Sequence, residues 1–162
     1  TIEAAGWAKR VFAIDRSAAV LQRARALARK HGARNIVWKR GEIERVPLPA
    51  ASVDVALLSQ ALHHAADPGL ALAEAVRVLR PGGRALLLDL RPHDQAWVKE
   101  RLGDHWLGFS DDALASLMRG AGLRDIRLTL GARKAGGPFT VTIASGVKGR
   151  ARASARPRRH EG

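Results

Sequence analysis

The sequence predicts an α/β fold with a doubly wound, mostly parallel sheet that ends in an antiparallel hairpin. The first observation is the stretch from Ser52 to Leu90, which reads as strand, loop, helix, turn and strand. Two apolar strands joined by a crossover helix indicate parallel pairing. The second observation is a pair of alternating strands near the C-terminus, joined by a glycine- and lysine-rich connection over residues 131–138. Alternation of this kind is typical of half-exposed antiparallel strands.

The composition is that of one globular domain followed by a basic tail. The chain has 162 residues, of which 46% are apolar, and it contains no cysteine, which excludes disulfides and cysteine-bound zinc. Of the formal net charge of +13, residues 148–162 supply six basic side chains against one acid, Glu161. We therefore expect a folded domain over residues 1–147 and a disordered basic tail over residues 148–162. Such a tail favours weak, non-specific contact with nucleic acid, although an arginine-rich composition alone would give the same charge.

The beginning of the chain carries no targeting signal. No apolar run approaches the ~18 residues of a membrane span, and no signal-peptide pattern is present, so we expect a cytoplasmic protein without such a span. Thr1 is not a methionine, and Thr1 to Lys9 reads as the last turns of a helix that leads into a strand. We therefore expect further sequence to precede this chain.

The first predicted strand, Val11 to Ile14, ends in an acid. Asp15 lies where nucleotide-binding α/β folds place a carboxylate that accepts two hydrogen bonds from a ribose diol. The alternative role for Asp15 is to cap the following helix. That helix is expected to begin after Ser17 and to end at Gly32, and residues 36–38 form the next short strand.

The central stretch supplies the expected ligand-binding edge of the sheet. Residues 53–58 form an apolar strand, Asp67 and Pro68 open a helix, and residues 81–83 stop this helix before a second strand over residues 85–88. Parallel sheets place their ligands beyond the carboxyl ends of the strands. Ser59, Gln60 and the two histidines His63 and His64 follow such an end.

His63 and His64 permit several interpretations. Neighbouring residues of an extended segment point to opposite sides, so we expect at most one imidazole to face the site. Neither a His-x-x-x-His motif nor a carboxylate triad accompanies the pair, and we therefore expect no metal site. One of them is a candidate general base or a group that orients a substrate. The alternative is a loop histidine packed against the helix that starts at Asp67.

The C-terminal half supplies a helix, a polar turn and the terminal hairpin. The first helix carries Trp97, and it is followed by the segment Gly-Asp-His-Trp-Leu-Gly-Phe-Ser over residues 103–110. Trp106 and Phe109 are candidates for lining an apolar substrate pocket, and the alternative is that they belong to the core. Ser110 is expected to cap the next helix, and strands are expected over residues 124–130 and 139–143.

Several strings in this order resemble one known family. A strand that ends in Asp-Val-Ala-Leu-Leu-Ser precedes an Ala-Leu-His-His loop and then the string Arg-Val-Leu-Arg-Pro-Gly-Gly at residues 77–83. The pattern resembles the class I S-adenosylmethionine-dependent methyltransferases, which have a Rossmann-like sheet. It is most similar to the small-molecule methyltransferase type 11 branch, which includes quinone-biosynthesis C-methyltransferases. The resemblance extends from about Thr1 to Lys148, and residues 103–110 also resemble methyltransferase domains that are fused behind a winged-helix metalloregulator.

This resemblance implies a cofactor and the residues that bind it. The cofactor would be S-adenosyl-L-methionine, bound by a methyltransferase domain over residues 1–147. Asp15, with Arg16 beside it, would hold the ribose, and Glu42 would accept a hydrogen bond from the adenine amino group although it is one methylene longer than the usual aspartate. Ile43 would lie against the adenine face, and Ser59 would lie near the methionine portion.

The resemblance also implies how a small-molecule methyl acceptor would bind. Gln60, His63 and Trp106 are the expected acceptor-binding residues, and His64 is the expected catalytic residue. Asp15 and Glu42 are the two acids on which this interpretation depends, because they must reach one nucleoside from neighbouring strand ends.

The chain departs from the family in one respect. The first strand and the glycine-rich turn that approaches the cofactor are absent, because Gly6 stands alone before the first predicted strand. We therefore expect cofactor binding only from a form that is extended upstream. Two other functions stay open, namely a nucleoside-sensing or nucleic-acid-associated regulatory module with little catalysis, and a nicotinamide-dependent dehydrogenase that uses Asp15.

Overall fold

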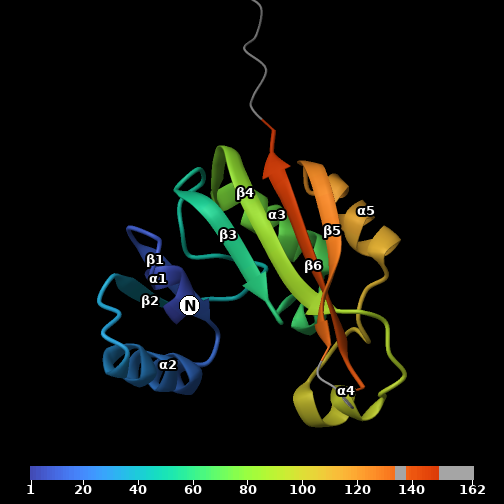
Figure 1. Cartoon of the computed structure of the whole chain (residues 1–162), viewed down its shortest axis with the longest axis horizontal. Helices are drawn as coiled ribbons and strands as arrows, with labels where there is room; N and C mark the ends of the chain where they lie inside the picture. The colour runs from blue at the N-terminus through green and yellow to red at the C-terminus, as the bar shows by residue number, and fades with distance from the viewer. Residues whose placement is uncertain (134–137, 150–162) are drawn as a thin grey trace, which may run out of the picture.

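The computed structural model describes residues 1–133 and 138–149 (Figure 1). Helices and strands are interspersed along most of the chain, and β5 and β6 are the last elements of the described part. In chain order the elements are α1 (Ile2–Ala5), β1 (Val11–Asp15), α2 (Ala18–Lys30), β2 (Ile36–Arg40), β3 (Val53–Ser59), η1 (Leu62–His64), α3 (Pro68–Val78), β4 (Leu79–Leu90), α4 (Trp97–Leu102), α5 (Asp111–Gly120), β5 (Leu123–Arg133) and β6 (Thr140–Lys148). Within the described residues, no helix is both long and apolar enough to cross a membrane.

The strands form two sheets. Strands β1 and β2 pair in parallel, and the larger sheet has the order β3-β4-β6-β5. Strand β3 is parallel to β4, with α3 as the crossover helix, whereas β6 is antiparallel to both β4 and β5. The α/β prediction is confirmed, including its parallel units and its C-terminal antiparallel strands. The division into two sheets agrees with the expected absence of the first strand, which is the central strand of the resembled family's sheet.

The predicted helix starts are confirmed because each has a side-chain cap. The Ser17 hydroxyl accepts a hydrogen bond from the Val20 amide at the start of α2, and the Ser110 hydroxyl accepts one from the Ala113 amide at the start of α5. The Asp67 carboxylate caps α3 in the same way. These bonds satisfy amide groups that the first turn of a helix leaves without partners.

The core lies between the larger sheet and two helices. Helices α3 and α5 cover the rear face of this sheet in Figure 1. Side chains that are almost completely buried fill this interface, namely Leu62, Leu72, Leu87, Leu114 and Met118. Burial of such side chains is the main force that holds the helices on the sheet.

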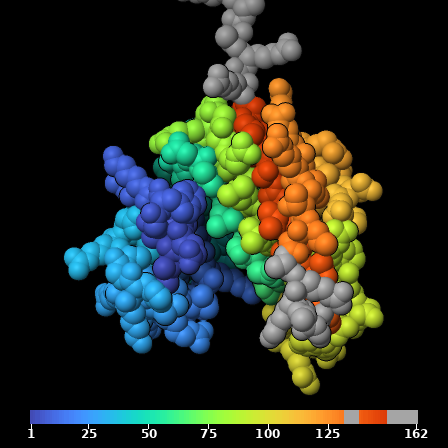
Figure 2. All heavy atoms as spheres, in the orientation of Figure 1, coloured from blue at the N-terminus to red at the C-terminus, as the bar shows by residue number. Residues whose placement is uncertain are grey.

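The front face of the larger sheet carries no helix in the described part of the chain, and β4, β6 and β5 lie side by side on the surface in Figure 2. Leu57 of β3 is 46% exposed, and Ile143 of β6 is 39% exposed. The neighbouring residue Thr142 is only 1% exposed. The buried face of β6 therefore consists of Thr142, Ala144 and Gly146, and the larger apolar side chain of Ile143 lies on the open face.

The predicted tail begins too early. Lys148 was assigned to the disordered tail, but it is the last residue of β6. Its ammonium group donates hydrogen bonds to the carbonyl oxygens of Val76 and Leu79, at 2.6 and 2.7 Å. Lys148 therefore caps the C-terminal end of α3. Residues 150–162 of the predicted tail and residues 134–137 of the hairpin connection lie outside the described residues.

The connector before β3 is fixed to α3 by an ion pair. The Arg77 guanidinium pairs with the Glu74 carboxylate at 2.6 Å and also donates to the carbonyl oxygens of Val46 and Leu48. Glu74 accepts a hydrogen bond from the Val46 amide at 2.8 Å. The extended connector therefore obtains its backbone hydrogen bonds from one helical turn.

Candidate functional site

The ends of β1 and β2 bring the two predicted nucleoside-binding segments together. Asp15 is the last residue of β1, and β2 runs beside it in parallel to Arg40, where Asp15 and Arg40 are paired. Beyond the end of β2, the Gly41 amide donates a hydrogen bond to the Asp15 carbonyl oxygen at 3.2 Å. Glu42 follows directly and is exposed. The two acids therefore lie on neighbouring strand ends, as the sequence predicts.

Asp15 has an observed structural role. Its Oδ1 accepts a hydrogen bond from the Ser17 amide at 2.7 Å, which supports the turn into α2. An ionised carboxylate can accept about four hydrogen bonds. The bond to Ser17 therefore leaves acceptor capacity for a ribose diol, and the ribose role stays a prediction.

Arg16 and Ile43 flank these acids. The Arg16 carbonyl oxygen accepts a hydrogen bond from the Arg40 side chain at 3.0 Å, which ties the turn after β1 to the end of β2. The Arg16 side chain is exposed. Ile43 is half-buried and packs against the main hydrophobic core, so only part of its surface is available to a ligand.

Strand β3 ends in a sharp turn at Gln60. Ser59 and Gln60 are both exposed, and Gln60 has a φ of 53°, in the left-handed region that non-glycine residues rarely adopt. The Gln60 amide donates to the Leu88 carbonyl oxygen at 2.7 Å, so the turn is held against β4. This turn places the histidine loop directly beyond the carboxyl end of β3.

The prediction that His63 and His64 point to opposite sides is wrong. Residues 62–64 form the short 3-10 helix η1 instead of an extended segment. The two imidazole rings are neighbours, with their centroids 4.1 Å apart. His63 is 4% exposed, whereas the His64 side chain is 38% exposed. Both rings line one cavity.

Two carboxylates that the sequence analysis did not identify complete this cluster. Asp89, near the end of β4, is 1% exposed, and its Oδ1 lies 2.7 Å from His63 Nδ1. Its Oδ2 accepts a hydrogen bond from the Leu62 amide. Asp104, beyond α4, is 4% exposed, and its Oδ1 lies 3.1 Å from His64 Nδ1 and 3.9 Å from His63 Nε2.

A sequence signal existed for only one of these acids. Asp89 interrupts the apolar string Leu-Leu-Leu-Asp-Leu at the ligand-binding end of a predicted buried strand, where a charged residue is unusual. Asp104 follows a glycine in a polar turn, and nothing in its local sequence indicates that it is buried.

The acids change the protonation of His63. Burial disfavours the imidazolium, but the hydrogen bond to Asp89 and the negative charges of Asp89 and Asp104 outweigh this effect and raise the pKa of His63 above its ordinary value. The His63 ring is buried and is held by Asp89, so it is not an exposed base.

The cluster lines a cavity of about 320 Å³. Gln60, both histidines and Asp104 form its polar part. The remaining lining is apolar and consists of Leu90, Val98, Leu102 and Phe139. A cavity of this size that combines an apolar wall with a few polar groups is typical of small-molecule sites.

Trp106 lies outside this lining and braces the histidine loop. Its indole Nε1 donates to the Ala65 carbonyl oxygen at 2.9 Å, and its ring stacks on Phe109 with centroids 5.9 Å apart. The indole is 42% exposed and Phe109 is buried. The acceptor-binding role of Trp106 stays a prediction.

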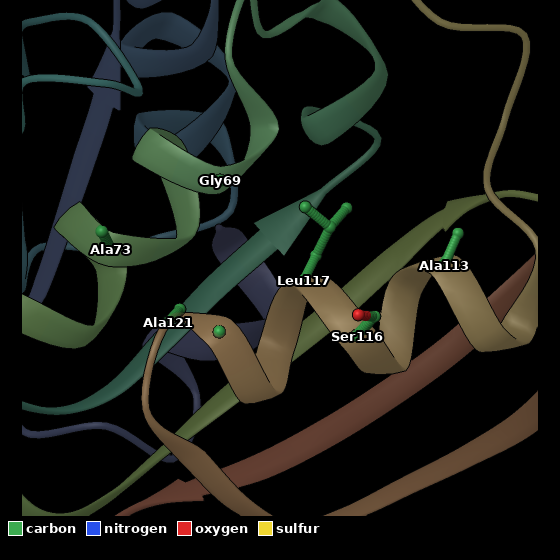
Figure 3. Close-up of a pocket in the computed structure, with 7 residues that line it drawn as sticks. Gly69, Ala73, Ala113, Ser116, Leu117 and Ala121 are labelled. Carbon is green, nitrogen blue, oxygen red and sulfur yellow. The ribbon is translucent and has the colours of Figure 1, made fainter.

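A second hollow lies between α3 and α5 (Figure 3). It has a volume of about 540 Å³ and is lined mainly by small residues of the two helices, namely Gly69, Ala73, Ala113, Ser116, Leu117, Gly120 and Ala121. Ser116 carries the only polar side chain in this lining. None of the predicted site residues takes part, so this groove is not the candidate site.

Comparisons with known proteins identify the family. Residues 1–87 match the methyltransferase domain family, and the chain belongs to this family. The ubiquinone/menaquinone biosynthesis C-methyltransferase UbiE of Caulobacter sp. (strain K31) is 45% identical over 71 residues, which cover 43% of this chain and 28% of that protein. The malonyl-[acyl-carrier protein] O-methyltransferase of Serratia marcescens is 38% identical over 98 residues, or 60% of this chain and 35% of the relative.

The solved structures show the same fold. The YcgJ protein of Bacillus subtilis superimposes with a TM-score of 0.70 at 17% identity, covering 91% of this chain and 86% of that chain. At this identity the match shows the fold alone. The chain spans less than half the length of the first curated relatives that it matches.

Family membership implies S-adenosyl-L-methionine as the cofactor, and the hydrogen-bond acceptors at the two strand ends of this chain fit it. The cofactor carries a ribose diol and an adenine amino group, both of which are hydrogen-bond donors. Asp15 and Glu42 supply acceptors on adjacent strand ends that the Gly41 to Asp15 hydrogen bond holds together. The expectations for the family, the fold and the cofactor are therefore confirmed.

Proposed function

We propose that the protein transfers a methyl group from S-adenosyl-L-methionine to a small-molecule acceptor. The observation that carries this proposal is the hydrogen bond from the Gly41 amide to the Asp15 carbonyl oxygen, because it holds two acid-bearing strand ends side by side. The histidine-lined cavity at the end of β3 would receive the acceptor.

In this proposal the nucleoside end of the cofactor is bound by four residues. Asp15 accepts hydrogen bonds from the ribose. Arg16, which is exposed, lies beside the ribose in the turn after β1. Glu42 accepts a hydrogen bond from the adenine amino group, and the exposed part of Ile43 lies against the purine face. Ser59 lies toward the methionine portion. When bound, the cofactor supplies an electrophilic methyl group, so the chain needs to orient the reactants and exclude water.

The acceptor would bind against the cluster beyond β3. Gln60 and His63 would orient the polar group of the acceptor. Trp106, which is bonded to the histidine loop, would contact the acceptor at the edge of the site. His64 is the proposed proton acceptor, since its side chain is partly exposed and the Asp104 carboxylate at 3.1 Å would stabilise the imidazolium that forms. The relatives include a ubiquinone/menaquinone biosynthesis C-methyltransferase and a malonyl-[acyl-carrier protein] O-methyltransferase, which supports a small or carrier-bound acceptor.

Calorimetry with S-adenosyl-L-methionine tests the proposal. The cofactor would be titrated into the 162-residue chain and into a form that begins further upstream. We expect binding from the upstream form, and Asp15→Ala in that form should weaken it at least about tenfold, because two hydrogen bonds to a charged acceptor are lost.

The matched control is Asp112→Ala, which removes an exposed acid from α5, away from the strand ends. Its affinity should equal that of the unmodified protein. Equal affinity of the Asp15→Ala and Asp112→Ala variants would overturn the ribose assignment, and no binding by either form would overturn the proposed function.

A further inference from the structure

The cluster beyond β3 combines three side chains that metal ions use as ligands. His63 and His64 come from η1, and Asp104 comes from the segment between α4 and α5. One ligand atom from each residue lies within 4.8 Å of the others. Metal bonds of about 2.0–2.1 Å in a tetrahedral site place ligand atoms about 3.4 Å apart. The distances of 3.1 and 3.9 Å from Asp104 Oδ1 to the two imidazoles bracket this value.

Asp104 has a buried carboxylate oxygen without a hydrogen-bond donor in the described part of the chain. Its side chain is 1% exposed, and its Oδ1 accepts no hydrogen bond from the residues that the structure describes. A buried carboxylate oxygen without a partner is costly, and native structures rarely keep one without a ligand or another cause. This oxygen lies beside both imidazoles, so a cation bound between the three groups would satisfy it.

Asp89 holds His63 in the orientation that a metal ligand needs. The contact of 2.7 Å between Asp89 Oδ1 and His63 Nδ1 leaves Nε2 on the side of Asp104. Asp89 is itself fixed by the Leu62 amide. Metal-binding histidines almost always donate their other ring nitrogen to a carboxylate, a carbonyl or water, which sets the tautomer and the direction of the ring.

The two segments that carry the ligands are also fixed to each other. The His63 carbonyl oxygen accepts hydrogen bonds from the amides of His105 and Trp106, at 2.9 and 3.1 Å. The Trp106 indole is anchored to Ala65 from the other side. The backbone that carries Asp104 is therefore held beside η1 before any ion binds.

We propose that His63 Nε2, a nitrogen of His64 and Asp104 Oδ1 form a binding site for a divalent transition-metal ion of the Zn²⁺ and Co²⁺ class. Imidazole nitrogens favour such ions over Mg²⁺ or Ca²⁺, which prefer oxygen ligands. Three protein ligands leave at least one coordination position open, and the cavity lined by Gln60, Leu90 and Phe139 lies beside it. The expectation of no metal site was based on motifs close to the histidines in the sequence. It did not include Asp104, which lies in the distant segment between α4 and α5.

This site requires neither the cofactor nor methyl transfer. It does affect the function proposed above, because one nitrogen of His64 cannot bind a cation and accept a proton at the same time. An occupied site would therefore remove the proton-acceptor role of that nitrogen.

Cobalt titration tests the site without any activity measurement. Untagged protein, stripped with a chelator and dialysed, would be titrated with Co²⁺ while visible absorption is recorded. We expect ligand-field bands that saturate at one ion per chain and disappear when Zn²⁺ is added. Removal of the Asp89 support in Asp89→Asn should weaken binding by about 10-fold to 100-fold, and removal of a ligand in Asp104→Asn or His64→Ala should weaken it at least as much.

The control is His31→Ala, which removes an exposed histidine at the end of α2 and should leave the titration unchanged. Far-ultraviolet circular dichroism would establish that the variants are folded. His64→Ala is the safer variant because its side chain is partly exposed. The absence of saturable bands, or equal Co²⁺ affinity in the folded His64→Ala variant and the unmodified protein, would overturn the proposal, whatever the outcome of the cofactor titration.

Discussion

At the scale of single residues, Gly108 shows how one position fixes the segment before α5. Its φ is +84°, and a Cβ atom there would clash with the Arg91 carbonyl oxygen. The next residue, Phe109, donates its amide to the Leu90 carbonyl oxygen at 2.8 Å. The close approach of two backbone segments therefore leaves room for glycine only.

We expect Gly108→Ala to lower the free energy of unfolding by about 3 kcal/mol, because left-handed strain adds to a clash with a backbone that must move. Gly32→Ala is the matched control. Its φ is +71°, but nothing lies within 4 Å of the added Cβ, so it should lose only about 1 kcal/mol. Urea unfolding of both variants measures the difference, and equal losses would show that the clash with Arg91 is relieved at no cost.

The residue scale also shows where sequence interpretation reaches its limit. The cap at Ser17 was predicted correctly because its hydrogen bond is made within three residues, to Val20, and the bond from the Ser17 amide to Asp15 agrees with the alternative role of Asp15 at the helix start. The partners of His63 are Asp89 and Asp104, which lie far away in the chain. The histidines could be named as candidates, but their partners depend on how β4 and the segment after α4 pack around η1.

At the scale of elements, the contact between the 46–49 connector and α3 depends on ionisation. The hydrogen bond from Arg77 lowers the pKa of Glu74 despite some opposing effect of burial, with help from the Val46 amide and the charges of Arg77 and Arg45. The folded state therefore binds this proton less readily than the unfolded chain. The resulting stabilisation is fully present above the unfolded pKa and is lost as the pH falls through the lowered folded pKa.

We expect Glu74→Gln to lower the free energy of unfolding by about 1 kcal/mol at pH 7. The difference from the unmodified protein should shrink as the pH falls below about 4.3, since the unmodified carboxyl is then increasingly protonated. Urea unfolding at pH 7 and pH 3 measures this change.

Glu100→Gln, which removes the charge of an exposed glutamate on α4, controls for the general effect of charge. A Glu74→Gln deficit that is constant from pH 7 to pH 3 would contradict the ion-pair explanation.

Elements were predicted more reliably than their assembly. The caps at Ser17 and Ser110 and the glycine after α2 are local signals, and the structure places the helix boundaries beside them. The strand order β3-β4-β6-β5 of the larger sheet has no local signal, because strand pairing depends on neighbours distant in sequence. The open face of β6 could not be predicted either, because a threonine can be buried when a carboxylate lies nearby. The Thr142 hydroxyl donates to Asp111 at 3.4 Å.

At the scale of the whole molecule, charge is distributed unevenly. Residues 150–162 contain five arginines and one glutamate, and no aromatic residue accompanies them. Such a segment would bind nucleic acid through phosphates, by release of counterions, and without base stacking.

We expect the protein to bind duplex DNA weakly, with an affinity that falls steeply as salt increases. The slope of log K against log salt is negative. Deletion of residues 150–162 should make it less steep by about 0.9 for each phosphate that the shortened protein no longer neutralises. A variant of the same length with the five arginines changed to serine is the control for chain length. Fluorescence anisotropy at several salt concentrations gives the slope, and an unchanged slope would discard a nucleic-acid role for this segment.

The cap that Lys148 places on α3 has a consequence for synthesis on the ribosome. The carbonyl oxygens of Val76 and Leu79 receive their hydrogen bonds from a residue that is translated 69 to 72 positions later. In a nascent chain, these carbonyl oxygens at the end of α3 therefore lack their Lys148 hydrogen bonds until β6 has left the exit tunnel. Stable folding of the larger sheet should consequently begin only after β6 has been translated, and chains that stall before β6 would be the forms that chaperones and proteases encounter.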